Sequence, residues 1–232
     1  MPKLFLIPCN LAPDTQNSHL PPVIKEIIQH TGVYFVEELK TARRFISSLR
    51  TGLVIENLLF EQLNKDTSID QTRAFFKKYS GKDIGILSEA GCPAIADPGS
   101  LAVQVAHELN YTVVPLPGPS SVFLALMASG FNGQGFTFNG YLNIDKAKRV
   151  ADLKMLEGLA QKGITQIFME TPFRNNQMLE SILDTCHPQT KLCIACNLTS
   201  TDEYIKTLSI EKWRTKKDRK DLHKLPTIFV LK

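Results

Sequence analysis

The chain has 232 residues, of which 43% are hydrophobic and 22% are charged, and its net charge is +4. This length suffices for one large α/β domain or two modest ones, and the composition is that of an ordinary globular protein. Because no uncharged apolar run approaches the ~20 residues of a membrane span, and because the charge excess is mild, composition argues against a membrane protein and a dedicated nucleic-acid-binding domain.

Strand-like and helix-like segments alternate from the start of the chain, which begins with a strand-like run at residues 3–8. With no signal-peptide pattern ahead of this run, we expect a cytoplasmic protein without a membrane anchor. Residues 53–63 are apolar but ambiguous. The other predicted elements of the first half are helix 20–29, strand 33–36, helix 37–49, helix 70–78, strand 84–87, helix 101–109 and strand 113–116.

The second half continues the same alternation, which predicts an α/β fold. The best place for a domain break is Pro117-Gly118-Pro119, close to the middle of the chain, giving expected domains 1–117 and 118–232. The predicted elements are helix 122–129, strand 136–141, helix 145–161, strand 164–169, helix 175–185, strand 191–196, strand 203–207, helix 210–214 and strand 226–231.

Two short apolar runs, 84–87 and 113–116, are each followed by a loop rich in Gly, Pro and Ser. Such runs suit strands buried on both faces of a parallel sheet, where ligands bind at the carboxyl ends of the strands. Any single loop of this kind is better explained as a tight turn. Similar polar loops at 170–172 and 197–199, after two later strands, favour a small-molecule pocket.

The motifs of several other ligand-binding and catalytic sites are absent from the sequence. The sequence contains no P-loop, no G-x-G-x-x-G after the first strand and no G-x-S-x-G elbow. Cys193 and Cys196 form a C-x-x-C, but it looks like strand interior and no second pair or paired His follows, so we favour structural cysteines and expect no metal. Basic clusters at 40–44, 146–149 and 212–220 are read as solvated surface in preference to phosphate contacts on charge alone.

Residues 88–99, which read SEAGCPAIADPG, resemble the Asp-Ala-Gly-Thr-Pro…Asp-Pro-Gly motif of the bacterial 16S ribosomal RNA ribose 2′-O-methyltransferase group, part of the tetrapyrrole methylase superfamily. Further blocks match in order at 115–121, 138–142 and 146–149, and 170–174 is similar to the family's Glu-Ser-Pro-His-Arg. The resemblance covers nearly the whole chain. It implies two α/β domains with mixed or parallel sheets, a cleft between them for S-adenosylmethionine, and a homodimer.

The resemblance also implies which residues line the cofactor. Carried over by position, they come from the first loop, the loop after strand 84–87, the domain junction and the later strand ends. The implied cofactor-binding residues are Pro8, Ser88, Glu89, Ala90, Gly91, Cys92, Ala94, Ile95, Ser120, Ser121, Met169, Glu170, Thr171, Cys196, Asn197 and Thr227.

The chain departs from the family pattern on the side expected to meet the substrate. Pro-Ile-Gly-Asn is replaced by residues 8–11, Glu-Asp-Thr-Arg by 37–40, and Arg-Glu-Leu-Thr-Lys by 196–200. Glu37 is the candidate acid or base, although a helix-starting acid explains it as well. The candidate substrate-binding residues are Asn10, Lys40, Arg43, Arg44 and Arg174; the three arginines could equally hold phosphate or pair with a carboxylate.

The leading hypothesis is therefore an S-adenosylmethionine-dependent methyltransferase that acts on RNA, by ribose 2′-O-methylation of small-subunit ribosomal RNA or of a related target. Two alternatives stay open because the first and second loops have changed. One is a methyltransferase for a small molecule such as a tetrapyrrole. The other is a protein that binds the cofactor without catalysis.

Overall fold

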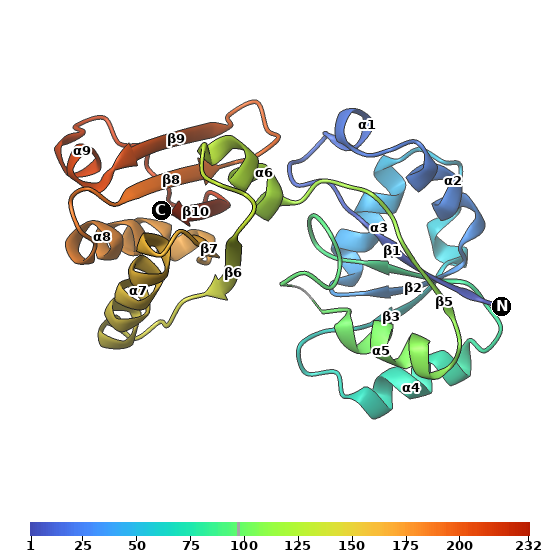
Figure 1. Ribbon diagram of the computed structural model, residues 1–232. Coiled ribbons are helices and arrows are strands. Elements are labelled where there is room, and N and C mark those ends of the chain that lie inside the picture. Colours follow the sequence, from blue (N-terminus) through green and yellow to red (C-terminus); the bar gives the residue numbers. More distant parts are fainter. Residues whose placement is uncertain (97) are drawn as a thin grey trace. The chain divides into compact units, whose positions relative to one another are not determined.

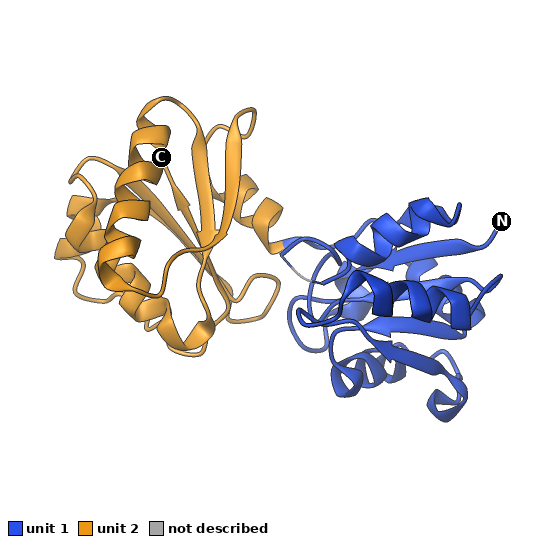
Figure 2. Ribbon diagram, turned by 90° about the horizontal axis from the view of Figure 1, so that it is seen from below, with its two compact units in different colours: residues 1–120 blue, residues 121–232 orange. Residues whose placement is uncertain are grey.

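The computed structural model describes residues 1–96 and 98–232 and divides the chain into two compact units, Met1–Ser120 and Ser121–Lys232. Figure 2 shows them in blue and orange. The division falls three residues after the expected domain boundary. Each unit contains its own five-stranded sheet and its own hydrophobic core.

Unit 1 is built on a sheet in which all neighbouring strands are parallel, in the order β3-β2-β4-β1-β5. The carboxyl ends of these strands therefore meet at one edge of the sheet. The strands are β1 (Lys3–Ile7), β2 (Val33–Val36), β3 (Leu59–Gln62), β4 (Ile84–Leu87) and β5 (Thr112–Pro115).

Helices cover both faces of this sheet (Figure 1). One core cluster joins Tyr34 and Val36 to α2 (Val23–His30) and α3 (Leu39–Ser48), and the other joins Val33 and Phe35 to α4 (Ile69–Lys78) and α5 (Ser100–Glu108). Successive residues of β2 thus face opposite layers. Right-handed crossovers explain the two layers of helices. The chain moves across the sheet in one direction from β1 through β2 to β3, and in the opposite direction from β3 through β4 to β5. The connecting helices therefore lie on one face of the sheet before β3 and on the other face after it.

The expectation that both short apolar strands are buried on both faces holds for one of them. All four residues of β4 are buried, whereas β5 is half-buried in the middle and exposed at its ends. The reason is the strand order, because β5 is an edge strand that pairs only with β1.

Unit 2 contains a mixed sheet in the order β6-β7-β10-β8-β9, in which β6 and β7 are parallel and the other neighbours are antiparallel. Because β10 runs against β7 and β8, its first residue lies at their carboxyl ends. The strands are β6 (Phe136–Tyr141), β7 (Thr165–Met169), β8 (Lys191–Cys196), β9 (Tyr204–Ser209) and β10 (Thr227–Leu231).

The core of unit 2 lies mainly between this sheet and three helices, α7 (Lys146–Gln161), α8 (Asn175–Thr185) and α9 (Ile210–Thr215). Trp213 of α9 is fully buried and donates its indole N–H to the Leu192 carbonyl at 2.9 Å, which locks α9 onto β8. The helix α6 (Ser121–Ser129) packs on β8, β9 and β10 from the other face (Figure 1).

The predicted alternation of strands and helices is confirmed throughout the described residues. The ambiguous stretch 53–63 forms a 3₁₀ turn, η1 (Ile55–Asn57), followed by the edge strand β3. The short helix α1 (Gln16–His19) was not predicted. It has four residues and no side-chain cap, so periodicity gives no signal for it.

Candidate functional site

The carboxyl-end edge of the unit 1 sheet gathers loops that lie far apart in the sequence. The loop after β1 and the loop after β4 form a two-residue antiparallel bridge: Cys9 N–H donates to the Gly91 carbonyl at 2.9 Å, and Gly91 N–H donates to the Cys9 carbonyl at 3.1 Å. The hydroxyl of buried Ser88 also donates to the Gly91 carbonyl, at 3.2 Å. The interior side of this sheet edge is thus formed by three buried residues, Pro8, Ser88 and Gly91.

The loop after β5 closes on the same place. A Cβ added to Gly118 would lie 2.2 Å from Cγ of Pro8, so only glycine fits against the proline ring. The Cys92 thiol lies 3.5 Å from the Pro119 carbonyl, and burial raises the pKa of this thiol. These contacts bring the loops after β4 and β5 together, and the prediction that the two loops form one small-molecule pocket stays a prediction.

The loop after β4 departs from ordinary backbone conformation. Ala94 and Ala96 have φ values of 67° and 63°, and Gly91 has 73°. Left-handed backbone in alanine is uncommon and clusters at ligand-binding sites. Ala90 and Ile95 are exposed. Asp97, which belongs to the motif in this loop, lies outside the described residues.

Two glutamates that follow neighbouring strands lie near each other at this edge. Glu37 follows β2 and Glu89 follows β4. Burial and then the negative charge of Glu89 raise the pKa of the Glu37 carboxyl, while the backbone N–H of Glu89 lowers it. One oxygen of Glu37, Oε2, is buried and has no hydrogen-bond partner among the described residues. Glu89 itself is exposed and accepts a long hydrogen bond of 3.4 Å from Thr41.

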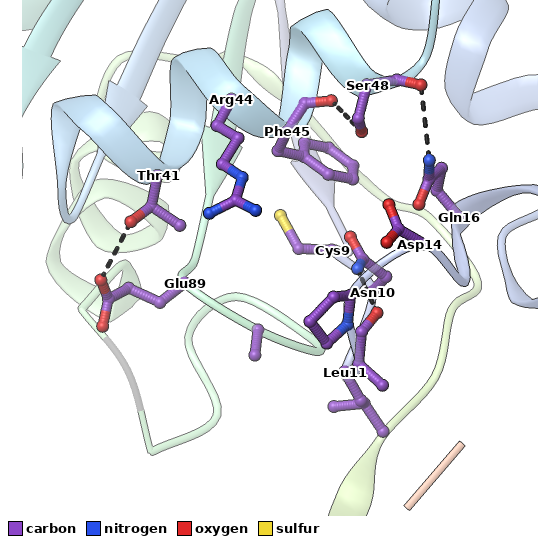
Figure 3. A pocket seen from close by; sticks show the side chains of 13 residues that line it. Cys9, Asn10, Leu11, Asp14, Gln16, Thr41, Arg44, Phe45, Ser48 and Glu89 are labelled. Atoms are coloured by element: carbon purple, nitrogen blue, oxygen red, sulfur yellow. Dashed lines mark hydrogen bonds between the residues drawn. The ribbon is translucent and has the colours of Figure 1, made fainter. Parts of the chain in front are cut away.

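A pocket of about 220 Å³ opens beside these loops (Figure 3). It lies between the loop after β1 and the exposed face of α3, and Glu89 and Ala90 form part of its wall. The volume is below the roughly 300–1,000 Å³ of typical drug-sized ligand sites, so this pocket suits a fragment of a larger ligand. The lining residues are Cys9, Asn10, Leu11, Ala12, Pro13, Asp14, Gln16, Thr41, Arg44, Phe45, Ser48, Glu89 and Ala90.

Three of the four cations predicted on the substrate side, Lys40, Arg43 and Arg44, lie on α3 and are exposed. Arg44 points into the pocket, between the Thr41–Glu89 pair and the Phe45 ring (Figure 3), and no ion pair to it occurs within the described residues. Arg43 lies over the Phe60 ring at 5.3 Å from the ring centroid. Lys40 lies in the first turn of the helix, and its backbone N–H donates to the Glu38 carboxylate at 3.1 Å.

Three pocket residues on α3 were missed by the sequence interpretation although a signal existed. Thr41, Phe45 and Ser48 share one helix face with the predicted Arg44, so that prediction could have been extended to its neighbours. Gln16 had no such signal, because it lies on the unpredicted α1. Asn10, which was predicted, donates a hydrogen bond from its side-chain amide to the Ala12 carbonyl at 2.5 Å.

The predicted residues of unit 2 collect at a second sheet edge. Strand register pairs Thr227 with Cys196 and Ile228 with Met169, so the ends of β7 and β8 and the start of β10 lie side by side. Cys196 and Thr227 are buried, and Met169 is half-buried. Ser120 and Ser121, at the boundary of the two units, are both half-buried.

Glu170 at this edge is engaged by its own loop. Its carboxylate, with a side chain that is only 2% exposed, accepts hydrogen bonds from the Thr171 N–H and the Arg174 guanidinium, both at 2.6 Å. Of the two roles considered for Arg174, the structure shows the carboxylate pair. One nitrogen, Arg174 Nε, is buried without a partner.

The loop after β8 resembles the loop after β4 in its strained backbone. Asn197 and Thr199 have φ values of 51° and 72°, and for a β-branched residue such as threonine this is a true outlier. The Thr199 hydroxyl is buried without a hydrogen-bond partner. An orphaned hydroxyl in a strained loop is a feature of ligand-binding sites.

These observations fit the chemistry of S-adenosylmethionine. Its ribose diol needs acceptors, and at the edge of unit 1 Glu89 offers an exposed carboxylate. The left-handed turns at Gly91 and Ala94 allow close approach of backbone groups. Among the described residues no group of three His, Cys, Asp or Glu is arranged to hold a metal, and no helix there is long and apolar enough to cross a membrane.

Comparison with protein families gives one match that spans most of the chain. The family described as "Tetrapyrrole (Corrin/Porphyrin) Methylases" matches residues 19–213. Among solved structures, the methyltransferase CobJ covers all of this chain and is itself covered to 94%, with a TM-score of 0.64 and 14% identity. Uroporphyrin-III C-methyl transferase from Thermus thermophilus, complexed with S-adenyl homocysteine, gives a TM-score of 0.58 at 13% identity, with 99% and 96% coverage.

Curated relatives are closer in sequence. Ribosomal RNA small subunit methyltransferase I from Vibrio cholerae is 39% identical over 134 residues, which is 58% of this chain and 46% of the relative. The protein of the same name from Bacillus subtilis is 37% identical, over 54% of this chain and 41% of the relative. The chain thus spans about half the length of the curated relatives it matches. The expected two-part α/β architecture is confirmed by the fold similarity.

Proposed function

We propose that this chain, which belongs to the tetrapyrrole (corrin/porphyrin) methylase family, transfers a methyl group from S-adenosylmethionine to RNA. The observation that carries the proposal is the edge of unit 1, where the loops after β1, β4 and β5 are joined and two glutamates lie near each other. The RNA acceptor is supported by the similarity to proteins named ribosomal RNA small subunit methyltransferase I.

In this proposal the loop after β4 binds the donor, with Glu89, Ala90 and Cys92 to Ile95 as its contacts. The donor supplies a methyl group activated by a sulfonium. The chain contributes alignment and exclusion of water, and the joined loops favour both because their backbone groups are already paired. The predicted contacts in unit 2, and the expected cleft between the two domains, stay predictions.

Glu37 is proposed as the acceptor of the proton that a ribose hydroxyl loses during transfer. A carboxylate whose pKa is raised towards the working pH is better suited to this role than an ordinary one. Burial and the Glu89 charge raise the pKa of Glu37, and its orphaned Oε2 has a free position for a proton donor. Arg44, in the adjacent pocket, is proposed to hold a phosphate of the acceptor.

A tetrapyrrole acceptor is less well supported. A pocket of about 220 Å³ is smaller than typical sites for drug-sized molecules, and a tetrapyrrole is larger still. A cofactor-binding protein without catalysis would have no use for the raised pKa of Glu37. A cytoplasmic location follows from the proposed RNA acceptor, and the homodimer expected from the family resemblance is a further proposal that sedimentation would test.

Titration calorimetry with S-adenosylmethionine tests the donor. Binding is expected, and the absence of heat up to about 1 mM ligand would sink the proposal, since that limit corresponds to roughly −4 kcal/mol. Glu89→Lys should abolish binding because it replaces the carboxylate proposed to accept from the ribose diol with a cation that cannot accept, whereas Glu56→Lys, at another exposed acid of unit 1, should bind like the wild type.

Labelled-methyl transfer to small-subunit RNA tests the reaction. Glu37→Gln should lower the rate constant of transfer by roughly 10²–10⁴-fold while donor affinity stays unchanged, the usual contribution of a general base. Glu38→Gln, at the neighbouring helix-cap position, is the matched control. Equal rates in the two variants would remove Glu37 from the mechanism.

A further inference from the structure

The positive charge of the chain is concentrated in residues 212–224. This segment contains seven Lys or Arg and two Asp, a net charge of +5, whereas the whole chain has +4. The rest of the molecule is therefore slightly negative. The segment runs from α9 to the start of β10, so it leads directly to Thr227 and the carboxyl-end edge of β7 and β8.

Three of these cations are engaged in hydrogen bonds or ion pairs within the unit. Arg214 donates to the carbonyls of Leu183 and Cys186 at the end of α8, and Arg219 pairs with Glu180 at 3.1 Å. Lys216 pairs with Asp218 at 2.7 Å. The remaining cations near β10 are exposed, and no ion pair to them occurs within the described ranges: Lys217, Lys220 and Lys224.

An exposed aromatic ring stands among these cations. Phe173, in the 3₁₀ turn η2 (Pro172–Arg174) after β7, is 68% exposed. The Lys224 ammonium lies 5.9 Å from its ring centroid, and the His223 ring lies 6.1 Å away at 73°. A single exposed phenylalanine is not unusual, but one flanked by an imidazole and a lysine presents a π-surface in a positive field.

Hydrogen bonds and a buried leucine fix the segment that carries His223 and Lys224 beside the Phe173 turn. Lys224 N–H donates to the Pro172 carbonyl at 2.9 Å, and Leu222, which is fully buried, anchors the segment in the core. Two asparagines at the start of α8 complete the attachment: Asn175 donates to the Leu225 carbonyl at 2.7 Å, and Asn176 accepts from Leu222 N–H at 2.9 Å. The ring is therefore positioned before any ligand arrives, which reduces the entropy cost of binding.

The ring and the cations also lie near the predicted donor-binding residues of unit 2. Phe173 is four residues after Met169 in the loop that follows β7. Lys220 lies close enough to Cys196 for its charge to act on the thiol, whose pKa is raised by burial and lowered by Thr227 and Lys220. Nearby acids are engaged, since Asp221 accepts from Asn176 at 2.6 Å and Glu170 pairs with Arg174.

We infer that Phe173 is a stacking platform for an unpaired base of the RNA acceptor, and that Lys217, Lys220 and Lys224 bind the phosphates on either side. The identity of the ligand rests on the proposed function. Aromatic rings among cations bind single strands because every base has a face that stacks and every nucleotide has a phosphate. A duplex hides its bases in its own stack and gains only the phosphate contacts.

The test is fluorescence anisotropy of a labelled single-stranded oligoribonucleotide of about twelve nucleotides, within the usual range for such sites. Phe173→Ala should weaken binding by about 5- to 100-fold, the usual range for loss of one stacked base, without changing the salt dependence. Phe173→Tyr keeps the ring and should bind within about twofold of the wild type. Lys217→Ala should weaken binding and also flatten the salt dependence.

Matched controls keep the outcomes distinct. Met155→Ala removes another exposed apolar side chain of unit 2 and should have no effect. Wild-type affinity in Phe173→Ala, or an equal loss on a duplex of the same sequence, would overturn the inference. So would a change of sedimentation coefficient in that variant, because it would mark the ring as a protein contact. Donor binding is measured on the same samples, so failure of the wild type to bind S-adenosylmethionine counts against the proposed function alone.

Discussion

The two sheet edges differ in how their charged side chains are satisfied. In unit 1 the loops after β1 and β4 are joined by the Cys9–Gly91 bridge, while Glu37 and Arg44 have no ionic partner within the described structure. In unit 2 the Glu170 carboxylate is paired with Arg174; left-handed backbone occurs at both edges, at Ala94 in unit 1 and at Asn197 and Thr199 in unit 2.

The difference separates residues that hold the fold from residues free for chemistry. Changes to the packed backbone of unit 1 and to the paired carboxylate of unit 2 should cost stability. Changes to the unpaired side chains of unit 1 should alter chemistry and cost little stability, since they make few native contacts. The strained loop of unit 2 should even gain stability when the strain is removed.

The largest effect is expected at the packed backbone of unit 1. Gly118→Ala places a Cβ 2.2 Å from Cγ of Pro8 and should destabilise the protein by about 3 kcal/mol, at the upper end of overpacking effects. Denaturant unfolding measures this loss. Gly32→Ala has open space around the new methyl group and serves as control. Adding Pro8→Gly to Gly118→Ala should recover part of the loss; no recovery would show that the contact is not the cause.

The next effect is expected at the paired carboxylate of unit 2. Glu170→Ala leaves the Thr171 N–H and the Arg174 guanidinium without their acceptor and should cost about 1–3 kcal/mol of unfolding free energy. The cost stays below that of a fully buried ion pair because the Arg174 side chain is 31% exposed and can turn to solvent. Glu180→Ala removes an exposed partner of Arg219 and should change stability little.

A smaller effect, with a pH signature, is expected at the glutamate pair of unit 1. Because the pKa of Glu37 is raised in the folded state, the native state holds its proton more tightly than the unfolded state. The stability that this raised pKa contributes is therefore complete below about pH 4.5, the ordinary pKa of a glutamate, and is lost as the pH rises through the raised pKa of the folded state. Glu37→Gln should flatten the pH dependence of unfolding in this window, and Glu89→Gln should reduce it. An unchanged profile in both variants would refute the pairing.

The smallest effect is expected at the strained loop of unit 2. Thr199→Gly removes a side chain held at a φ of 72° together with its unpartnered hydroxyl, and should stabilise the protein by up to about 1 kcal/mol. Thermal or denaturant unfolding detects the gain. Thr201→Gly, two residues along in an exposed turn without positive φ, should lose stability instead. A loss at both positions would mean that the loop is not strained.

Local sequence patterns predicted most of the fold because apolar periodicity is a local property. β4 and α8 were predicted with the residues they have in the structure. Strand order is not local, and this explains the miss at β5, whose Val113 and Val114 look like core residues but lie at a sheet edge. The pairing of Glu37 with Glu89 was hidden for the same reason, since it depends on β2 and β4 being neighbours.

The candidate site was predicted in part. The proximity of the loops after β4 and β5 was expected because both follow the carboxyl ends of parallel strands. The contact of Gly118 with Pro8 was not expected, because it depends on β1 lying between β4 and β5 in the sheet. The exposure of Phe173 could not be predicted either. Its ring stands out because Leu222 and the two asparagines of α8 hold the segment beside it, and these contacts span about fifty residues.

The reciprocal pair of bonds between Cys9 and Gly91 also determines how this part of the molecule breathes. Separation of the two loops would expose both amide protons, so hydrogen exchange at the two positions should show one common protection factor. Two loops more than eighty residues apart would then open as a single unit. A ligand that touches either loop would slow exchange in both, which makes these two amides natural reporters of occupancy.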